Sequence, residues 1–325
     1  MQKPVRWGVL GAANFARHHM APAIHAAKGA DFYALATSSP EKAEPFQEFA
    51  PNLKVHSSYE ALLADPEVEA IYIPLPNHLH VEWSLKAIEA GKHVLCEKPM
   101  TMQAEEFDRL IEARDRSGLL VAEAYMIVHH PQWIRAKELV GEGAIGKLVH
   151  VDAAFSYNLL DMDNIRNRPE VGGGSLPDIG VYTFGSTRFV TGEEPEAVEH
   201  AVVRRENGVD TFALVTARFP GFTYSGFTSM RMHPRQEVVF HGTEGVLRVA
   251  HGPFNANLHD MAQVILETGD NVRTAERWPA ANHYVLQVEA FGRTLREGAA
   301  YPCPLEFSKG TQRMIDMVLE RERAG

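Results

Sequence analysis

Cysteine is scarce in this chain, because Cys96 and Cys303 are the only two among 325 residues. A disulfide framework is therefore excluded, and a reducing cytoplasm is the simplest compartment. Long apolar runs are also missing, since no stretch approaches the roughly 20 residues that span a bilayer. Residues 1–7 lack the apolar core and small-residue cleavage site of a signal peptide. We expect a cytoplasmic protein without a membrane partner.

Positive charge is in short supply as well. The chain has 32 Lys and Arg against 42 Asp and Glu, a formal net charge of −10, and no basic run interrupts this balance. Neither a nucleic-acid backbone nor an anionic membrane is an expected partner. The hydrophobic content of 45% is ordinary for a globular protein, and 325 residues exceed one ordinary core. About two domains are predicted.

The first third of the chain alternates apolar strand-like runs with helix-compatible segments. Strands are expected at residues 5–10, 31–37, 54–56, 70–74, 94–96 and 119–123. Helices are expected up to about residue 28, from residue 40, and over 58–64, 80–90 and 104–117. Such alternation is typical of βαβ units, whose right-handed crossovers give a doubly wound parallel sheet. We therefore predict an α/β fold with a Rossmann domain over residues 1–122 and a second domain over 123–325.

The first strand-to-helix turn carries the dinucleotide fingerprint in altered form. Its residues, expected to bind the cofactor, are Gly11, Ala12, Ala13, Asn14 and Phe15. Alanines replace the second and third glycines of G-x-G-x-x-G, and the third position accepts alanine. A tight turn without a ligand is the alternative. The place of the turn, first in a βαβ series, favours phosphate held by backbone N–H groups at a helix N-terminus.

The end of the second expected strand addresses the choice of dinucleotide. NAD enzymes usually place an acid there, whereas NADP enzymes need cationic or hydroxyl groups for the 2′-phosphate. This chain has Thr37, Ser38, Ser39 and Lys42 instead of an acid at the strand tip. NADP is therefore expected, with NAD possible. In the alternative, Ser39 only caps its helix and Lys42 is solvated, which would fit use of both cofactors.

A carboxylate and an ammonium follow the strand expected at 94–96. Glu97, Lys98 and Pro99 stand where an open α/β sheet binds its ligands, at the carboxyl end of a strand. Lys98 could bind, orient or transfer a proton there; a solvated surface lysine is the alternative. Pro74, Asn77 and His80 follow another strand end, and we expect them to contact the cofactor. The alternative for His80 is an N-terminal helix residue.

Four stretches of sequence, at residues 7–14, 76–80, 90–99 and 172–182, together resemble the glucose–fructose oxidoreductase and inositol dehydrogenase (Gfo/Idh/MocA) family. Tyr182, where inositol dehydrogenases carry histidine, resembles the branch of glucose–fructose oxidoreductase, xylose and glucose dehydrogenases, and dimeric dihydrodiol dehydrogenase. The resemblance implies a second α/β domain with a large, mostly antiparallel sheet. The resemblance also implies that the exposed face of this sheet pairs subunits into homodimers or homotetramers. A cofactor that stays bound is also possible.

The second part of the sequence agrees with that implication. Strand-like runs lie at residues 148–155, 197–204, 211–219, 222–231, 236–241 and 246–250. Turn signals such as Asn207-Gly208 separate some of them at hairpin spacing, which favours antiparallel pairing. Helices are expected at 181–190 and 308–322.

The resemblance also implies roles for single residues. Oxidising a sugar or polyol hydroxyl requires a base, and the candidates are Lys98 and Tyr182. A neighbouring ammonium would lower the pKa of the Tyr182 phenol, so the two are expected to act together. Asp178, one helical turn before Tyr182, is expected to hold the substrate hydroxyl or the lysine. Glu97 is expected to fix Lys98 or border the nicotinamide, and Arg166 to bind substrate unless it is solvated.

One departure concerns the substrate. Ile127 and Val128 stand where relatives often carry an aromatic residue and an arginine, so the pocket could be more apolar and suit a less hydroxylated or cyclic diol. The paired histidines make no recognisable metal site, and a strand-buried Cys96 is expected to be inert. An NADP-dependent sugar or polyol dehydrogenase is therefore the first hypothesis. The alternatives are trans-dihydrodiol dehydrogenase activity and a non-catalytic dinucleotide-binding regulator.

Overall fold

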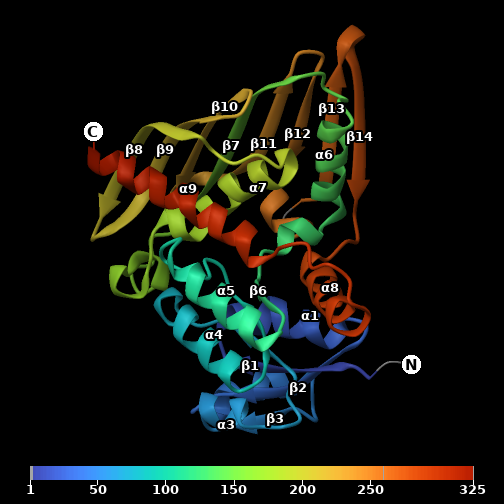
Figure 1. Ribbon diagram of the computed structural model, residues 1–325, viewed down its shortest axis with the longest axis vertical. Helices are drawn as coiled ribbons and strands as arrows, with labels where there is room; N and C mark the ends of the chain where they lie inside the picture. The colour runs from blue at the N-terminus through green and yellow to red at the C-terminus, as the bar shows by residue number, and fades with distance from the viewer. Residues whose placement is uncertain (1–2, 259, 325) are drawn as a thin grey trace. The chain divides into compact units, whose positions relative to one another are not determined.

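The computed structural model describes residues 3–258 and 260–324, which form two compact units. The first unit holds the chain up to Thr101, Glu105–Met126 and His283–Ser308. The second holds Met102–Ala104, Ile127–Asn282 and the chain from Lys309 on. Figure 1 shows both units and labels most of their helices and strands. The first unit thus gains a late segment of the chain, a return that the sequence did not predict.

A six-stranded parallel sheet forms the centre of the first unit, in the order β3-β2-β1-β4-β5-β6. Its strands are β1 (Val5–Leu10), β2 (Ala30–Ala36), β3 (Lys54–His56), β4 (Ala70–Ile73), β5 (His93–Cys96) and β6 (Val121–Glu123). The strand order reverses between β1 and β4, which is the point where doubly wound sheets bind their ligands. The predicted Rossmann sheet is confirmed, with every strand within two residues of its expected bounds.

Helices and short turns connect these strands. They are η1 (Ala16–Met20), α1 (Ala21–Ala26), η2 (Pro40–Lys42), α2 (Glu44–Gln47), α3 (Tyr59–Leu63), η3 (Asn77–Leu79), α4 (His80–Glu89), α5 (Glu106–Ser117) and α8 (His283–Glu297). Ser58 caps α3 by accepting from Ala61 N, and Gly118 ends α5 at φ +68°. The core packs buried apolar residues of β1, β4 and β5 against α4 and α5. α8 packs on α1.

The second unit is built on an eight-stranded sheet in the order β14-β13-β12-β11-β7-β10-β9-β8. Its strands are β7 (Leu148–Asn158), β8 (Ala197–Glu206), β9 (Val209–Phe219), β10 (Phe222–Ser229), β11 (Arg231–Gly242), β12 (Gly245–Ala250), β13 (Ala262–Thr268) and β14 (Val272–Trp278). β7 and β10 pair in parallel and every other neighbouring pair is antiparallel. The expected mostly antiparallel sheet is confirmed.

Helices pack on this sheet, as Figure 1 shows for α6 (Pro131–Gly141) and α7 (Val181–Thr191). α6 contacts β12, β13 and β14, while α7 contacts β7, β10 and β11. The remaining elements are η4 (Met126–His129), η5 (Ile165–Asn167), η6 (Pro169–Val171), η7 (Leu176–Gly180), η8 (Pro253–Asn255), η9 (Gly269–Asn271) and α9 (Leu305–Ala324). No helix of residues 3–258 and 260–324 is both long and apolar enough to cross a bilayer.

Candidate active site

The turn after β1 is shaped for close approach of a ligand to backbone. Gly11 adopts φ +93°, and a Cβ there would meet the Tyr59 hydroxyl at 3.1 Å. Its N–H donates to the Ala36 carbonyl at 2.9 Å, which ties the turn to the end of β2. A continuous helical stretch begins at residue 14 and runs to residue 26, with a π-helical turn near its start. The first N–H groups of a helix have no intrahelical partner and attract anions. The turn therefore fits a pyrophosphate.

In the loop after β2, two of the hydroxyl groups expected to meet the cofactor form hydrogen bonds within the loop itself. The Thr37 hydroxyl donates to the Ser39 carbonyl at 3.3 Å and accepts from the Ser39 N–H at 3.2 Å. The Ser39 hydroxyl donates to Glu41 at 2.9 Å rather than capping the η2 turn. Ser38 and Lys42 are both exposed. Of the four residues expected to meet the 2′-phosphate, these two are therefore the exposed ones.

The loop after β5 carries Glu97, Lys98 and Pro99, with a cis peptide bond between the last two. Glu97 N–H donates to the Ile73 carbonyl at 3.0 Å, so the loop leaves the sheet in register with β4. Tyr72 of β4 donates its hydroxyl proton to Glu97 Oε1 at 2.6 Å. The other oxygen of Glu97 accepts from the backbone N–H of Lys98 at 3.3 Å. Glu97 thus fixes the backbone of the lysine, one of its two expected roles.

Two further buried side chains hold the same loop from other elements. The ring nitrogens of His80, at the start of α4, lie 2.8 Å from the Pro99 carbonyl and 2.7 Å from the Leu75 carbonyl. Glu123, at the end of β6, accepts from Met100 N–H at 2.8 Å. His80 is 0% exposed, so it presents no ring atom to a ligand, and its pKa is lowered by burial. Its geometry is that of a positioning residue, unlike the expected cofactor contact. Pro74 and Asn77 are only partly buried.

Glu97 has an unusual charge balance. Burial raises its pKa to about 7, against the opposing effects of the Tyr72 hydrogen bond and the Lys98 charge. Tyr284 of α8 lies close enough for the Glu97 charge to add to burial in raising the tyrosine's pKa. Its ring also meets Phe15 of the first turn, with centroids 5.8 Å apart. Tyr284 was not expected at this site, because it is nearly 190 residues from Glu97 in sequence.

In the second unit, the structure brings together three expected substrate-side residues. Asp178 Oδ2 lies 2.9 Å from Nε of Arg166, and the charge of Asp178 raises the pKa of that arginine. The same oxygen accepts from the hydroxyl of Tyr157 at 2.6 Å. Tyr157 stays protonated because burial, and then the Asp178 charge, raise its pKa. The sequence did not identify Tyr157, whose position near the end of β7 resembles any alternating strand residue.

Tyr182 lies in the first turn of α7 and is 6% exposed. Its ring packs against Phe155 and Phe254, with centroids 5.7 and 5.5 Å away. Its phenol also contributes to the raised pKa of Arg166, after the larger effects of Asp178 and Tyr157, whereas burial lowers that pKa. The π-helical turn Leu176–Gly180 leads directly into α7, so Asp178 and Tyr182 belong to one continuous helical run. Within the second unit, Arg166, Asp178 and Tyr182 form one polar cluster. Phe155 and Phe254 pack against the ring of its tyrosine.

Other candidates have a structural place. Ile127 and Val128, considered as pocket-lining residues, are 0% and 1% exposed and belong to the core. They therefore give no evidence for a more apolar pocket. Cys96 is fully buried, and burial raises the pKa of its thiol well above the ordinary value. Among the described residues, no three His, Cys, Asp or Glu side chains are grouped to hold a metal ion.

Comparison with known proteins agrees with this architecture. Residues 5–125 match the oxidoreductase family with an NAD-binding Rossmann fold, and residues 133–248 match the GFO/IDH/MocA C-terminal domain. A dTDP-3,4-didehydro-2,6-dideoxy-α-D-glucose 3-reductase of Saccharopolyspora spinosa is 34% identical over 100% of this chain and 98% of its own. A D-xylose 1-dehydrogenase (NADP⁺) of Haloferax volcanii is 33% identical over 98% of each.

A solved structure shares the whole fold. The 3-ketoreductase of Actinomadura kijaniata, in complex with NADP and TDP-benzene, has a TM-score of 0.89 and 30% identity over 97% of this chain and 96% of that chain. The resemblance carried by residues 7–14, 76–80, 90–99 and 172–182 is therefore confirmed: this chain belongs to the Gfo/Idh/MocA family of oxidoreductases.

Proposed function

We propose that this protein is an NADP-dependent oxidoreductase that moves a hydride between nicotinamide and a hydroxyl or carbonyl carbon of a sugar or polyol. The observation that carries the proposal is the Lys98 loop, held at the carboxyl edge of a sheet of Rossmann order in a chain of this family. The relatives named for xylose oxidation and for dideoxy-sugar reduction support the substrate class.

The first unit's residues fit NADP. The Gly11 turn and the helix start behind it would hold the pyrophosphate, while Ser38 and Lys42 would meet the 2′-phosphate. Thr37 and Ser39 shape that loop. When bound, NADP supplies the carbon that accepts or donates the hydride. The protein's share is to orient the sugar and to move one proton.

Lys98 and Tyr182 share that proton transfer in our proposal. In the oxidising direction the substrate hydroxyl loses its proton to one of these side chains as its carbon loses the hydride. In the reducing direction the same group returns the proton to the new alkoxide oxygen. Asp178, fixed by Tyr157 and Arg166, accepts a hydrogen bond from a neighbouring sugar hydroxyl. Arg166 supports Asp178 and borders the same sugar.

A turnover assay tests the proposal. Purified protein is mixed with NADP and a panel of aldoses, polyols, a trans-dihydrodiol and, with NADPH, TDP-linked keto sugars, while the absorbance of the reduced nicotinamide is followed. We expect turnover with at least one sugar-type compound. Lys98→Ala should reduce it by about 100-fold or more. The matched control is Lys86→Ala, whose ammonium pairs with Glu82 on the surface of α4, and it should retain activity. Tight NADP binding without turnover of any compound would favour the alternative function, a non-catalytic dinucleotide-binding regulator.

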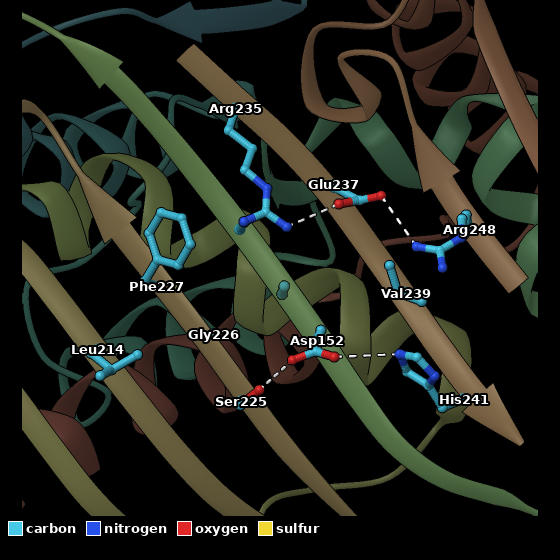
Figure 2. A pocket seen from close by; sticks show the side chains of 12 residues that line it. Asp152, Leu214, Ser225, Gly226, Phe227, Arg235, Glu237, Val239, His241 and Arg248 are labelled. Atoms are coloured by element: carbon cyan, nitrogen blue, oxygen red, sulfur yellow. Dashed lines mark hydrogen bonds and ion pairs between the residues drawn. The ribbon is translucent and has the colours of Figure 1, made fainter. Parts of the chain in front are cut away.

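Self-association is part of the proposal. Directly paired residues cross the sheet of the second unit in one row, Val202 with Leu214, Leu214 with Phe227, and Phe227 with Ala154. Val202 and Leu214 are 50% and 43% exposed. A hollow of about 490 Å³ lies on the sheet. Leu214, Phe227 and Arg235 are among the residues that line it, and Figure 2 labels them.

An apolar row that leaves Val202 and Leu214 exposed favours burial against a second copy. We therefore propose a homodimer or homotetramer, tested by analytical ultracentrifugation of the chain and of Leu214→Glu. A monomer at all concentrations would contradict it. We also propose a reducing compartment such as the cytoplasm, because both cysteines are buried free thiols.

A further inference from the structure

Glu97 occupies a place in the first unit that the proposed hydride transfer does not use. In a sheet of this order the loop after β2 meets the adenosine ribose and the turn after β1 meets the pyrophosphate. The other half of a bound dinucleotide must then lie over the ends of β4 and β5, across the switch point. Glu97 follows β5 directly, and Tyr72 of β4 holds one of its oxygens.

The titratable groups that interact with Glu97 come from three strands, its own loop and α8. They are Tyr72 of β4, Cys96 of β5, Lys98 of its own loop, Glu123 of β6 and Tyr284 of α8. Burial raises the pKa of Tyr72, Cys96 and Tyr284, so these three stay neutral near pH 7. Lys98 favours the ionised form of Glu97, and Glu123 disfavours it.

Geometry leaves Glu97 able to respond to a ligand. Its side chain is only partly buried, and both of its oxygens accept hydrogen bonds that either protonation state can keep. Phe15 of the pyrophosphate turn and Tyr284 meet at 5.8 Å, so Tyr284 joins the turn to the surroundings of Glu97. The oxidised nicotinamide ring carries a positive charge and the reduced ring is neutral. A carboxylate beside the ring would therefore distinguish the two forms.

We propose that Glu97 is a proton-linked sensor of cofactor charge, which releases its proton to solvent when the oxidised dinucleotide binds and keeps it when the reduced one binds. This inference rests on the proposed NADP dependence. The step is a simple acid dissociation: the O–H bond of Glu97 breaks, its electron pair stays on the carboxylate, and no electron is transferred. Oxidised cofactor would then bind more tightly as pH rises, while binding of reduced cofactor would not depend on this group.

Isothermal titration calorimetry in buffers of different ionisation enthalpy counts the protons. The intact chain is titrated with NADP⁺ and with NADPH between about pH 6 and 8. Both carry the same 2′-phosphate, so its titration cancels in the comparison. We expect NADP⁺ to release about one proton more than NADPH near pH 6 and almost none more near pH 8. The NADP⁺ affinity should rise by about fivefold to tenfold over that range relative to NADPH.

Two variants test the assignment to Glu97. Glu97→Gln should bind both cofactors with no difference in proton release. Tyr72→Phe removes the hydrogen bond that favours the ionised carboxylate, so its proton release should extend to higher pH. Equal proton release by NADP⁺ and NADPH in the parent chain, or a difference that persists in Glu97→Gln, would overturn the inference. Failure of the parent chain to bind either cofactor would instead refute the proposed function.

Discussion

The partly buried carboxyl of Glu97 leads to a prediction about the stability of the protein without cofactor. Its pKa is about 7 in the fold against an ordinary 4.5, so the fold binds a proton that the unfolded chain releases between these values. A group whose pKa is raised on folding stabilises the protein while it is protonated, and that contribution is lost as pH rises through about 7. At 1.36 kcal/mol per pKa unit, the raised pKa of Glu97 lowers the free energy of unfolding by about 3 kcal/mol at pH 8, compared with a pH at which Glu97 is protonated in both states. The same loss of unfolding free energy is only about 1 kcal/mol at pH 5.

Glu97→Gln removes this titration and keeps an oxygen that can accept from Tyr72. The variant should therefore gain about 2 kcal/mol on the parent chain between pH 5 and pH 8. In differential scanning calorimetry of the cofactor-free proteins, the gap between their melting temperatures should widen by about 4–8 °C over that range. Glu89→Gln, on the exposed end of α4, is the control and should melt in parallel with the parent. A gap for Glu97→Gln that stays constant with pH would refute the argument.

Three other changes test single contacts of the site. Tyr157→Phe removes the hydroxyl that donates to Asp178 at 2.6 Å, worth about 1.5–3 kcal/mol, so kcat/KM for the sugar should fall by about tenfold to 100-fold while NADP binding is unchanged. Unchanged kcat/KM would contradict the positioning of Asp178. Gly11→Ala forces a side chain into the left-handed region and to within 3.1 Å of the Tyr59 hydroxyl. The NADP affinity measured by calorimetry should therefore fall by about tenfold or more, and an unchanged affinity would be incompatible with the turn as described. His80→Ala should lower kcat rather than raise KM, because it frees the Pro99 carbonyl and loosens the Lys98 loop; a change confined to KM would argue against positioning.

Local patterns in the sequence were enough for the first sheet. Short apolar runs between turn residues predicted all six strands, and the hairpin signal at Asn207-Gly208 appears in the structure as two residues of positive φ joining β8 to β9. Long-range features were missed. β14 reads Val-Arg-Thr-Ala-Glu-Arg-Trp, and its charged, largely exposed residues lack the apolar alternation of a half-buried strand. It is an edge strand, ordered by pairing with β13.

The candidate site likewise combines residues that stand out in the sequence with residues that only the fold brings close to them. Glu97, Lys98 and Pro99 stand out because they are adjacent and follow a strand. The groups that fix their loop are Tyr72, His80 and Glu123, which come from three other elements. Each of them looks ordinary in its own stretch of sequence, and only the fold makes it a neighbour of the lysine. Grafting the tripeptide onto another Rossmann strand would therefore supply a lysine without its fixed backbone, and catalytic geometry tolerates little such looseness. The sequence can identify the candidate lysine, whereas the position of its loop depends on residues from several elements of the sheet.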